Sequence, residues 1–175
     1  MTRGDRLSIG ASIPGFSLPV LAVLTAVGGA MLLGVQGGWL IAIAVIAVIG
    51  VILPQVGGLW MAAGGLIIAL ALAPPDPART AVAIAAVHLL QVLGSLSLTI
   101  PLRARVALRA LAPTGIRFVI VQAIAQGIAL AVGMLPQVGA LPLAVVGGGL
   151  AVLVLVAGGI HMLRMRRQAA YRVRP

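Results

Sequence analysis

The feature that most constrains the fold of this chain is a succession of continuous apolar runs, separated by short turns and basic segments. Apolar residues follow one another within each run instead of alternating with polar ones, so the period-two pattern of a membrane β-barrel is excluded. Only 8% of the residues are charged, far below the roughly 25% of soluble domains. We therefore expect an all-α integral membrane protein, a polytopic helical bundle that forms a single transmembrane domain over residues 1–175.

Six spans are predicted, over residues 18–35, 39–53, 58–73, 80–100, 118–135 and 141–163. The second and third runs are short, because about 15 helical residues reach only ~22 Å against the ~30 Å of a hydrocarbon core. An alternative keeps four spans and folds residues 39–73 into a re-entrant hairpin. We favour two spans, since the combined run is longer than re-entrant segments usually are.

Charge predicts the orientation. All 12 basic residues are arginine, and they gather mainly in the lead-in 1–17, the loop 102–117 and the tail 164–175. The positive-inside rule places these three segments, and hence both termini, in the cytoplasm. The connection that carries Asp76 and Arg79 has no net charge and is expected outside. A short interfacial helix is expected in the cytoplasmic loop, and anionic lipid headgroups are expected to contact the loop and the tail through Arg103, Arg105, Arg109, Arg117, Arg164, Arg166, Arg167, Arg172 and Arg174.

Residue usage suggests a location. Lysine, glutamate, asparagine and cysteine are absent, and the bias toward arginine, alanine, glycine and proline is typical of a GC-rich bacterial genome. A bacterial plasma (inner) membrane is therefore expected. The first run is interpreted as a retained span, because no small-x-small cleavage site follows it. Nucleic acid is not expected as a partner, since the arginines flank apolar runs and few aromatic residues accompany them.

Two sequence patterns indicate how the helices pack: a row of small residues on the first run, and a heptapeptide that occurs twice. Ala22, Ala26, Ala30 and Gly34 follow i, i+4 steps, which lets another helix approach this face closely. The heptapeptides LPQVGGL (53–59) and LPQVGAL (135–141) match at six of seven positions. They are interpreted either as an inverted repeat of the kind that transporters use, or as two similar helix-to-helix turns in a chain rich in Gly, Val and Leu.

Polar side chains recur inside the fourth and fifth predicted spans. His88, Gln91 and Ser95 share one helical face, and Gln122 and Gln126 share another. Counting from the connecting loop predicts that Gln91 lies beside Gln126 and Ser95 beside Gln122. Two interpretations stay open: a mid-membrane cluster in which His88 passes a proton, or neutral groups that only join helices, typically worth ~0.6 kcal/mol each. The second is favoured, because no carboxylate accompanies them.

The residue inventory argues against catalysis. The two acids, Asp5 and Asp76, are predicted on opposite sides of the membrane, and the two histidines are too few for a zinc site. No metal, cofactor or enzymatic activity is expected. The predicted function is a non-catalytic accessory or assembly subunit that packs against a membrane-protein partner or another copy of itself. The alternative is a small inverted-repeat transporter or channel with the polar cluster on its pathway.

Overall fold

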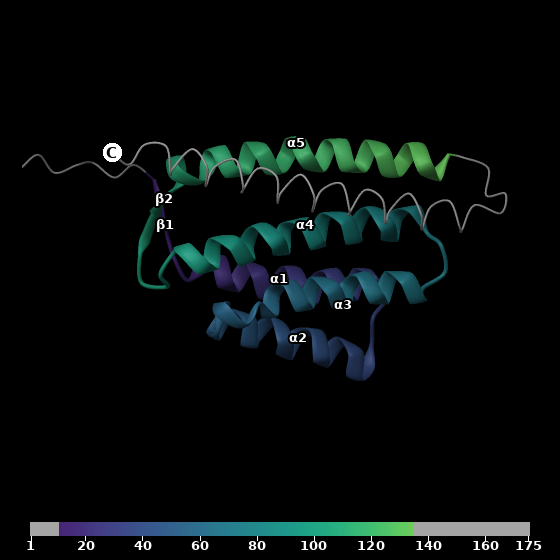
Figure 1. The fold of residues 1–175 in the computed structure, drawn as a ribbon, viewed down its shortest axis with the longest axis horizontal. Coiled ribbons are helices and arrows are strands. Elements are labelled where there is room, and N and C mark those ends of the chain that lie inside the picture. The colour runs from purple at the N-terminus through teal and green to yellow at the C-terminus, as the bar shows by residue number, and fades with distance from the viewer. Residues whose placement is uncertain (1–10, 135–175) are drawn as a thin grey trace, which may run out of the picture. The chain divides into compact units, whose positions relative to one another are not determined.

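The computed structural model describes residues 11–134, which are mostly helical. The helices are α1 (Ser17–Leu32), α2 (Gly37–Ile52), α3 (Gly58–Leu72), α4 (Pro77–Thr99) and α5 (Leu108–Gly133), with a 3₁₀ turn η1 (Pro54–Val56) between α2 and α3. Helices α1 to α4 pack side by side with alternating direction, and α5 packs against α4 (Figure 1). The lead-in up to residue 10, the second heptapeptide, the predicted sixth span 141–163, His161 and the tail with its five arginines lie outside the described residues.

The core of this bundle combines alanines with leucines and Ile43, and large apolar side chains also cover much of its surface. Ala22, Ala26 and Ala30 have no exposed surface, as predicted for a close-packing face of the first run, and other buried alanines come from α2, α3 and α4. By contrast, Leu72 is 82% exposed and Leu32 is 69% exposed. Soluble monomers rarely expose large apolar patches, so the many exposed leucines, isoleucines and valines of this surface are unusual for one.

Local backbone chemistry explains where α1 and α4 end and begin. After α1, Gly34 takes a φ of +78°, and the amides of Gly34 and Val35 donate to the carbonyls of Met31 and Ala30, each at 2.9 Å. This is a Schellman motif, in which glycine occupies the left-handed position at no steric cost. Gly34 therefore ends the helix instead of extending the small-residue face along it.

Helix α4 starts at a side-chain cap. The carboxylate of Asp76 accepts hydrogen bonds from the amides of Ala78 at 2.8 Å and Arg79 at 3.4 Å, and Pro77 fills the first helical position, where no amide donor is needed. The same carboxylate lies 3.4 Å from the Nε of Arg79. Asp76 and Arg79, whose charges cancel in this connection, thus also form an ion pair.

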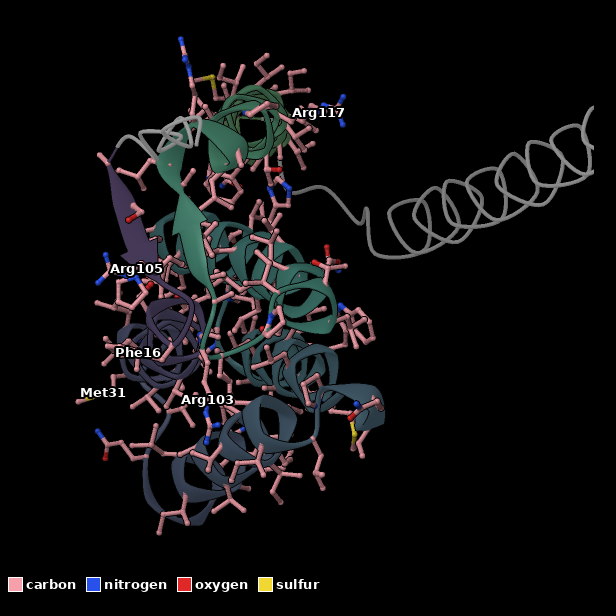
Figure 2. All side chains as sticks on the ribbon, turned by 90° about the vertical axis from the view of Figure 1, so that its left-hand side faces the viewer. Phe16, Met31, Arg103, Arg105 and Arg117 are labelled. Atoms are coloured by element: carbon pink, nitrogen blue, oxygen red, sulfur yellow. The ribbon has the colours of Figure 1, made fainter. Side chains whose placement is uncertain are left out.

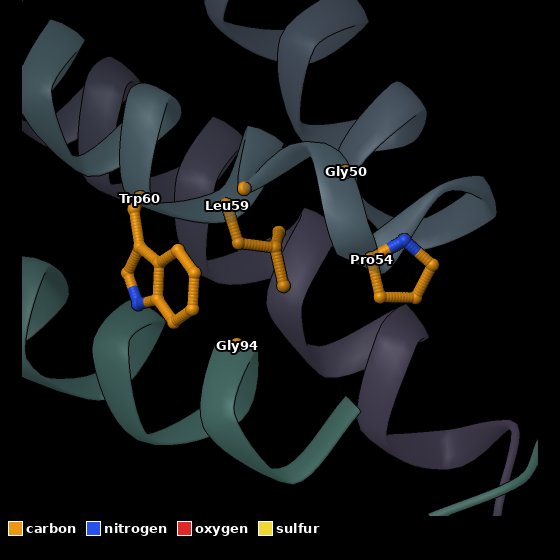
Figure 3. Close-up of a pocket in the computed structure, with 6 residues that line it drawn as sticks. Gly50, Pro54, Leu59, Trp60 and Gly94 are labelled. Carbon is orange, nitrogen blue, oxygen red and sulfur yellow. The ribbon is translucent and has the colours of Figure 1, made fainter. Parts of the chain in front are cut away.

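Helices α2 and α3 cross at two glycines. A Cβ added at Gly50 would meet the backbone of Gly58 and Leu59, and one added at Gly58 would meet the backbone of Gly50 and Ile46. The first heptapeptide supplies the turn here, with Gly57 at a φ of +73°. Next to the crossing, the indole of Trp60 covers Gly94 of α4, whose added Cβ would lie 3.3 Å from Nε1 (Figure 3).

The sequence predicted a short interfacial helix in the loop 102–117, and this prediction is wrong. Strand β2 (Arg105–Ala107) pairs antiparallel with β1 (Ser12–Pro14), and α5 then runs without a break from Leu108. Pro113 and Gly115 look like loop residues in the sequence. Pro113 is nevertheless the sixth residue of α5, where it removes one backbone hydrogen bond without ending the helix.

Helix length supports the membrane interpretation only in part. Helices α4, with 23 residues, and α5, with 26, are long and apolar enough to cross a bilayer. The helices over the first three apolar runs have 16, 16 and 15 residues, and are too short by themselves to cover ~30 Å. Six full-length spans are therefore not supported by the lengths of the described helices.

Candidate functional site

The polar groups singled out in the sequence meet where α5 lies on α4. On α4, the i, i+3, i+7 spacing puts His88, Gln91 and Ser95 on one side of the helix. On α5, Thr114, Phe118, Gln122 and Gln126 follow at steps of four. These two rows form the polar seam between the helices. Thr114 and Phe118 were missed in the sequence, although their spacing from the two glutamines was the available signal.

The central contact of the seam joins His88 to Gln122. His88 Nδ1 and Gln122 Oε1 are 3.1 Å apart, so the bond requires a proton on Nδ1 when the amide oxygen faces the ring. The ring of Phe118 lies 4.7 Å from the imidazole, centroid to centroid, at an interplanar angle of 31°. The imidazole is thereby held between an amide and an aromatic ring, which fixes its orientation.

A second bond ties the seam further along. Gln126 Nε2 donates to the carbonyl of Ala81 at 2.8 Å. The predicted pairs, Gln91 with Gln126 and Ser95 with Gln122, are therefore wrong, and α5 is displaced along α4 by about two turns from the expected register. The cause is the early start of α5, which leaves only residues 100–107 between the helices. Ser95 Oγ donates within its own helix, to the carbonyl of Gln91 at 2.9 Å.

Part of the seam stays open. A groove of about 380 Å³ is lined by His88, Gln91, Val92, Ser95, Leu96 and Thr114. Beside it, Gln122 Nε2 is buried and has no hydrogen-bond partner among residues 11–134. A buried amide donor without a partner costs free energy. Among the described residues, Gln122 Nε2 is the one buried side-chain polar atom that lacks a hydrogen bond.

Arg103, Arg105 and Arg109 lie at the end of the bundle where β1 and β2 pair, whereas Arg117 lies further along α5, next to Phe118. Arg103, Arg105, Arg109 and Arg117 are all exposed. Figure 2 views this end and shows Arg105 and Arg117 pointing away from each other. The side chains are spread along the surface and do not converge on one point, which suits contact with many headgroups better than binding of one anion.

The chemistry that this seam offers is limited to neutral hydrogen bonding and one imidazole. Within the described part of the chain, no three His, Cys, Asp or Glu side chains gather in a group that could hold a metal ion. Comparison with known proteins gives no assignment, since no family model, no curated protein and no solved structure matches the chain.

Proposed function

We propose that the chain is a multi-pass protein of a bacterial plasma membrane, with six spans and both termini in the cytoplasm. The strongly apolar surface supports it, because lipid solvates the exposed leucines and isoleucines that water would not. Three of the exposed arginines, Arg103, Arg105 and Arg109, belong to one end of the bundle, whereas the other end carries the neutral pair of Asp76 and Arg79. This asymmetry supports the proposed orientation.

The placement of the α2–α3 turn favours two crossings over a re-entrant hairpin. Pro54 lines one cavity together with Gly15, Pro101 and Leu102, so the turn reaches the level of the basic loop. The hairpin accordingly runs the whole length of its neighbours α1 and α4. Short helices of this kind require a locally thinned bilayer, at a cost of fractions of a kcal/mol per Å of mismatch.

As its function we propose a non-catalytic accessory or assembly subunit. The observation that carries this proposal is the state of α5: the described part of the chain buries none of its residues, although most of them are apolar. On this helix Ala123, Gly127 and Ala131 follow i, i+4 steps and are all exposed. The small-residue face of α1, by contrast, is already filled by the bundle itself. We propose that a helix of a partner or of a second copy packs on this face.

Native mass spectrometry of the gently solubilised protein tests this proposal. We expect a stoichiometric membrane-protein partner or a second copy, which Gly127→Leu removes while the chain stays folded. Gly64→Leu, on α3, is the matched control, since neither glycine has an atom within 4 Å of an added Cβ. A monomer without partner, or a complex that Gly127→Leu leaves intact, would contradict the proposal.

A small transporter or channel is the second candidate, favoured by the open groove beside His88. Flux across reconstituted vesicles separates the two. For a transporter, His88→Ala should abolish flux and Ser97→Ala should not, because Ser97 bonds only within its own helix, to the carbonyl of Leu93 at 2.8 Å. Flux that survives His88→Ala would remove this candidate.

A further inference from the structure

The end of the bundle opposite the basic loop contains a second cavity, of about 320 Å³. Its walls come from four elements: the turn after α1, the start of α2, the end of α3 and the start of α4. The lining is mostly apolar, with Leu33, Val35, Ala69, Leu72 and Ala73. Its volume lies at the lower end of the range for small-molecule sites, about 300 to 1,000 Å³.

One cation reaches into this cavity. Arg79 lines it, and its Nη2 lies 3.9 Å from the position that a Cβ on Gly34 would occupy. The guanidinium thus extends from α4 toward the α1–α2 turn, and glycine at position 34 leaves that approach free. The Arg79 side chain is 39% exposed. It is the one arginine of the described residues at this end, which the positive-inside rule otherwise keeps free of cations.

The donors of Arg79 are only partly used. Its Nε lies beside the carboxylate of Asp76, while no hydrogen bond joins its terminal nitrogens to another described residue. A guanidinium presents two terminal nitrogens as a planar fork, which matches phosphate and carboxylate oxygens in a bidentate geometry. Asp76 therefore orients the side chain from one edge and leaves the other edge to a ligand.

The start of α2 adds further donors. Its N-cap, Gln36, makes no side-chain hydrogen bond to the first turn, and both Gln36 and Trp39 line the cavity. Helix α4, which begins at the same end, has its first amides capped by Asp76. Uncapped amides at a helix start favour an anion. The half-exposed indole of Trp39 belongs to the residue type that gathers at membrane headgroup level.

We propose that this cavity binds the phosphate of an anionic amphiphile, with Arg79 on the phosphate oxygens and the acyl part on Leu33, Ala69 and Leu72. An apolar lining with a single guanidinium suits a ligand that has one charged group and a hydrocarbon tail. The ligand is either a phospholipid of the bilayer or a phosphate ester taken from solution. The site requires no partner subunit, so it is independent of the function proposed above.

Tryptophan fluorescence of the full chain in a neutral detergent tests the site. The chain has two tryptophans, and Trp60→Phe leaves Trp39 as the only reporter. Dihexanoyl phosphatidic acid should change the emission saturably. Dihexanoylglycerol, which lacks the phosphate, and inorganic phosphate, which lacks the tail, should each bind about tenfold more weakly or worse. Equal binding of inorganic phosphate would identify a free anion as the ligand, and equal binding of dihexanoylglycerol would overturn phosphate recognition.

Variants then identify the residue responsible. Arg79→Gln should weaken binding of phosphatidic acid about tenfold or more, and Arg79→Lys by less, because lysine keeps the charge and loses the fork. Arg105→Gln, in β2 at the other end, is the matched control and should bind normally. If Arg79→Gln fails to fold, Ala69→Leu fills the cavity with Arg79 intact and should also weaken binding. Unchanged binding in either variant overturns the proposal.

Discussion

His88 of α4 and Gln122 of α5 lie 34 residues apart in the chain and share a hydrogen bond of 3.1 Å. Together with the bond from Gln126 to the Ala81 carbonyl, it supplies the polar part of the α4–α5 contact. This contact buries no residue of α5 fully. These two hydrogen bonds therefore matter more for the position of α5 than polar groups do for the helices α1 to α4, which apolar packing holds together.

The first prediction concerns this pair. In a double-mutant cycle, His88→Ala and Gln122→Ala should show a coupling free energy of about 0.6 to 2 kcal/mol, the range measured for hydrogen bonds between membrane helices. The measurement is reversible unfolding in mixed micelles. Ser95→Ala, which removes only a bond within α4, is the control and should change stability by less than about 0.5 kcal/mol. Additive effects of the two variants would show that the bond contributes nothing.

The second prediction concerns the glycine crossing of α2 and α3. Gly50→Ala should lower the free energy of unfolding by about 1 to 3 kcal/mol, since its methyl group meets the backbone of α3 and the helices must separate. Gly64→Ala is the matched control in α3. Its methyl group meets no atom within 4 Å, and alanine is the better helix former, so stability should rise by up to about 1 kcal/mol. The same unfolding assay compares them, and equal effects would contradict the crossing.

The third prediction separates the two roles of Asp76. Asp76→Ala removes both the cap of α4 and the ion pair, and should cost about 1 kcal/mol. Asp76→Asn keeps a capping oxygen and loses only the pair with Arg79, which is well exposed and therefore worth little. Thermal unfolding followed by circular dichroism should thus rank Asn close to the wild type and Ala below it. If Asn lowered stability as much as Ala does, the stabilisation would belong to the ion pair.

The sequence predicted the helical class, because apolar runs are a local property. Local spacing also singled out His88, Gln122 and Gln126, but it missed Thr114 and Phe118. It failed on the start of α5 and on the register of the seam. Both depend on the pairing of Ser12–Pro14 with Arg105–Ala107, two segments far apart in the chain.

The sequence also could not predict which rows of small residues pack against another helix. The row Ala22, Ala26 and Ala30 on α1 and the row Ala123, Gly127 and Ala131 on α5 have the same spacing. The bundle buries the first completely and the described residues leave the second exposed. Spacing identifies a face that permits close approach, but it carries no information on which helix approaches it.

The fourth prediction tests the membrane and the orientation together. The chain has no cysteine, so single cysteines can be introduced without a background. Gln55→Cys in η1 and Arg105→Cys in β2 are both exposed and belong to the same end of the bundle, whereas Gln36→Cys is exposed at the other end. In intact cells, a membrane-impermeant maleimide should label Gln36→Cys alone. After permeabilisation, it should also label Gln55→Cys and Arg105→Cys.

These labelling results separate the topologies. If 39–73 were a re-entrant hairpin that turns within the bilayer, Gln55→Cys would stay unlabelled even after permeabilisation, while Arg105→Cys would react. Labelling of Gln55→Cys from outside would invert the orientation. Equal labelling of all three only after cell lysis, in a soluble fraction, would refute the membrane location. Gln137→Cys, in the second heptapeptide, completes the test, because an inverted repeat requires it to react from the side opposite to Gln55→Cys.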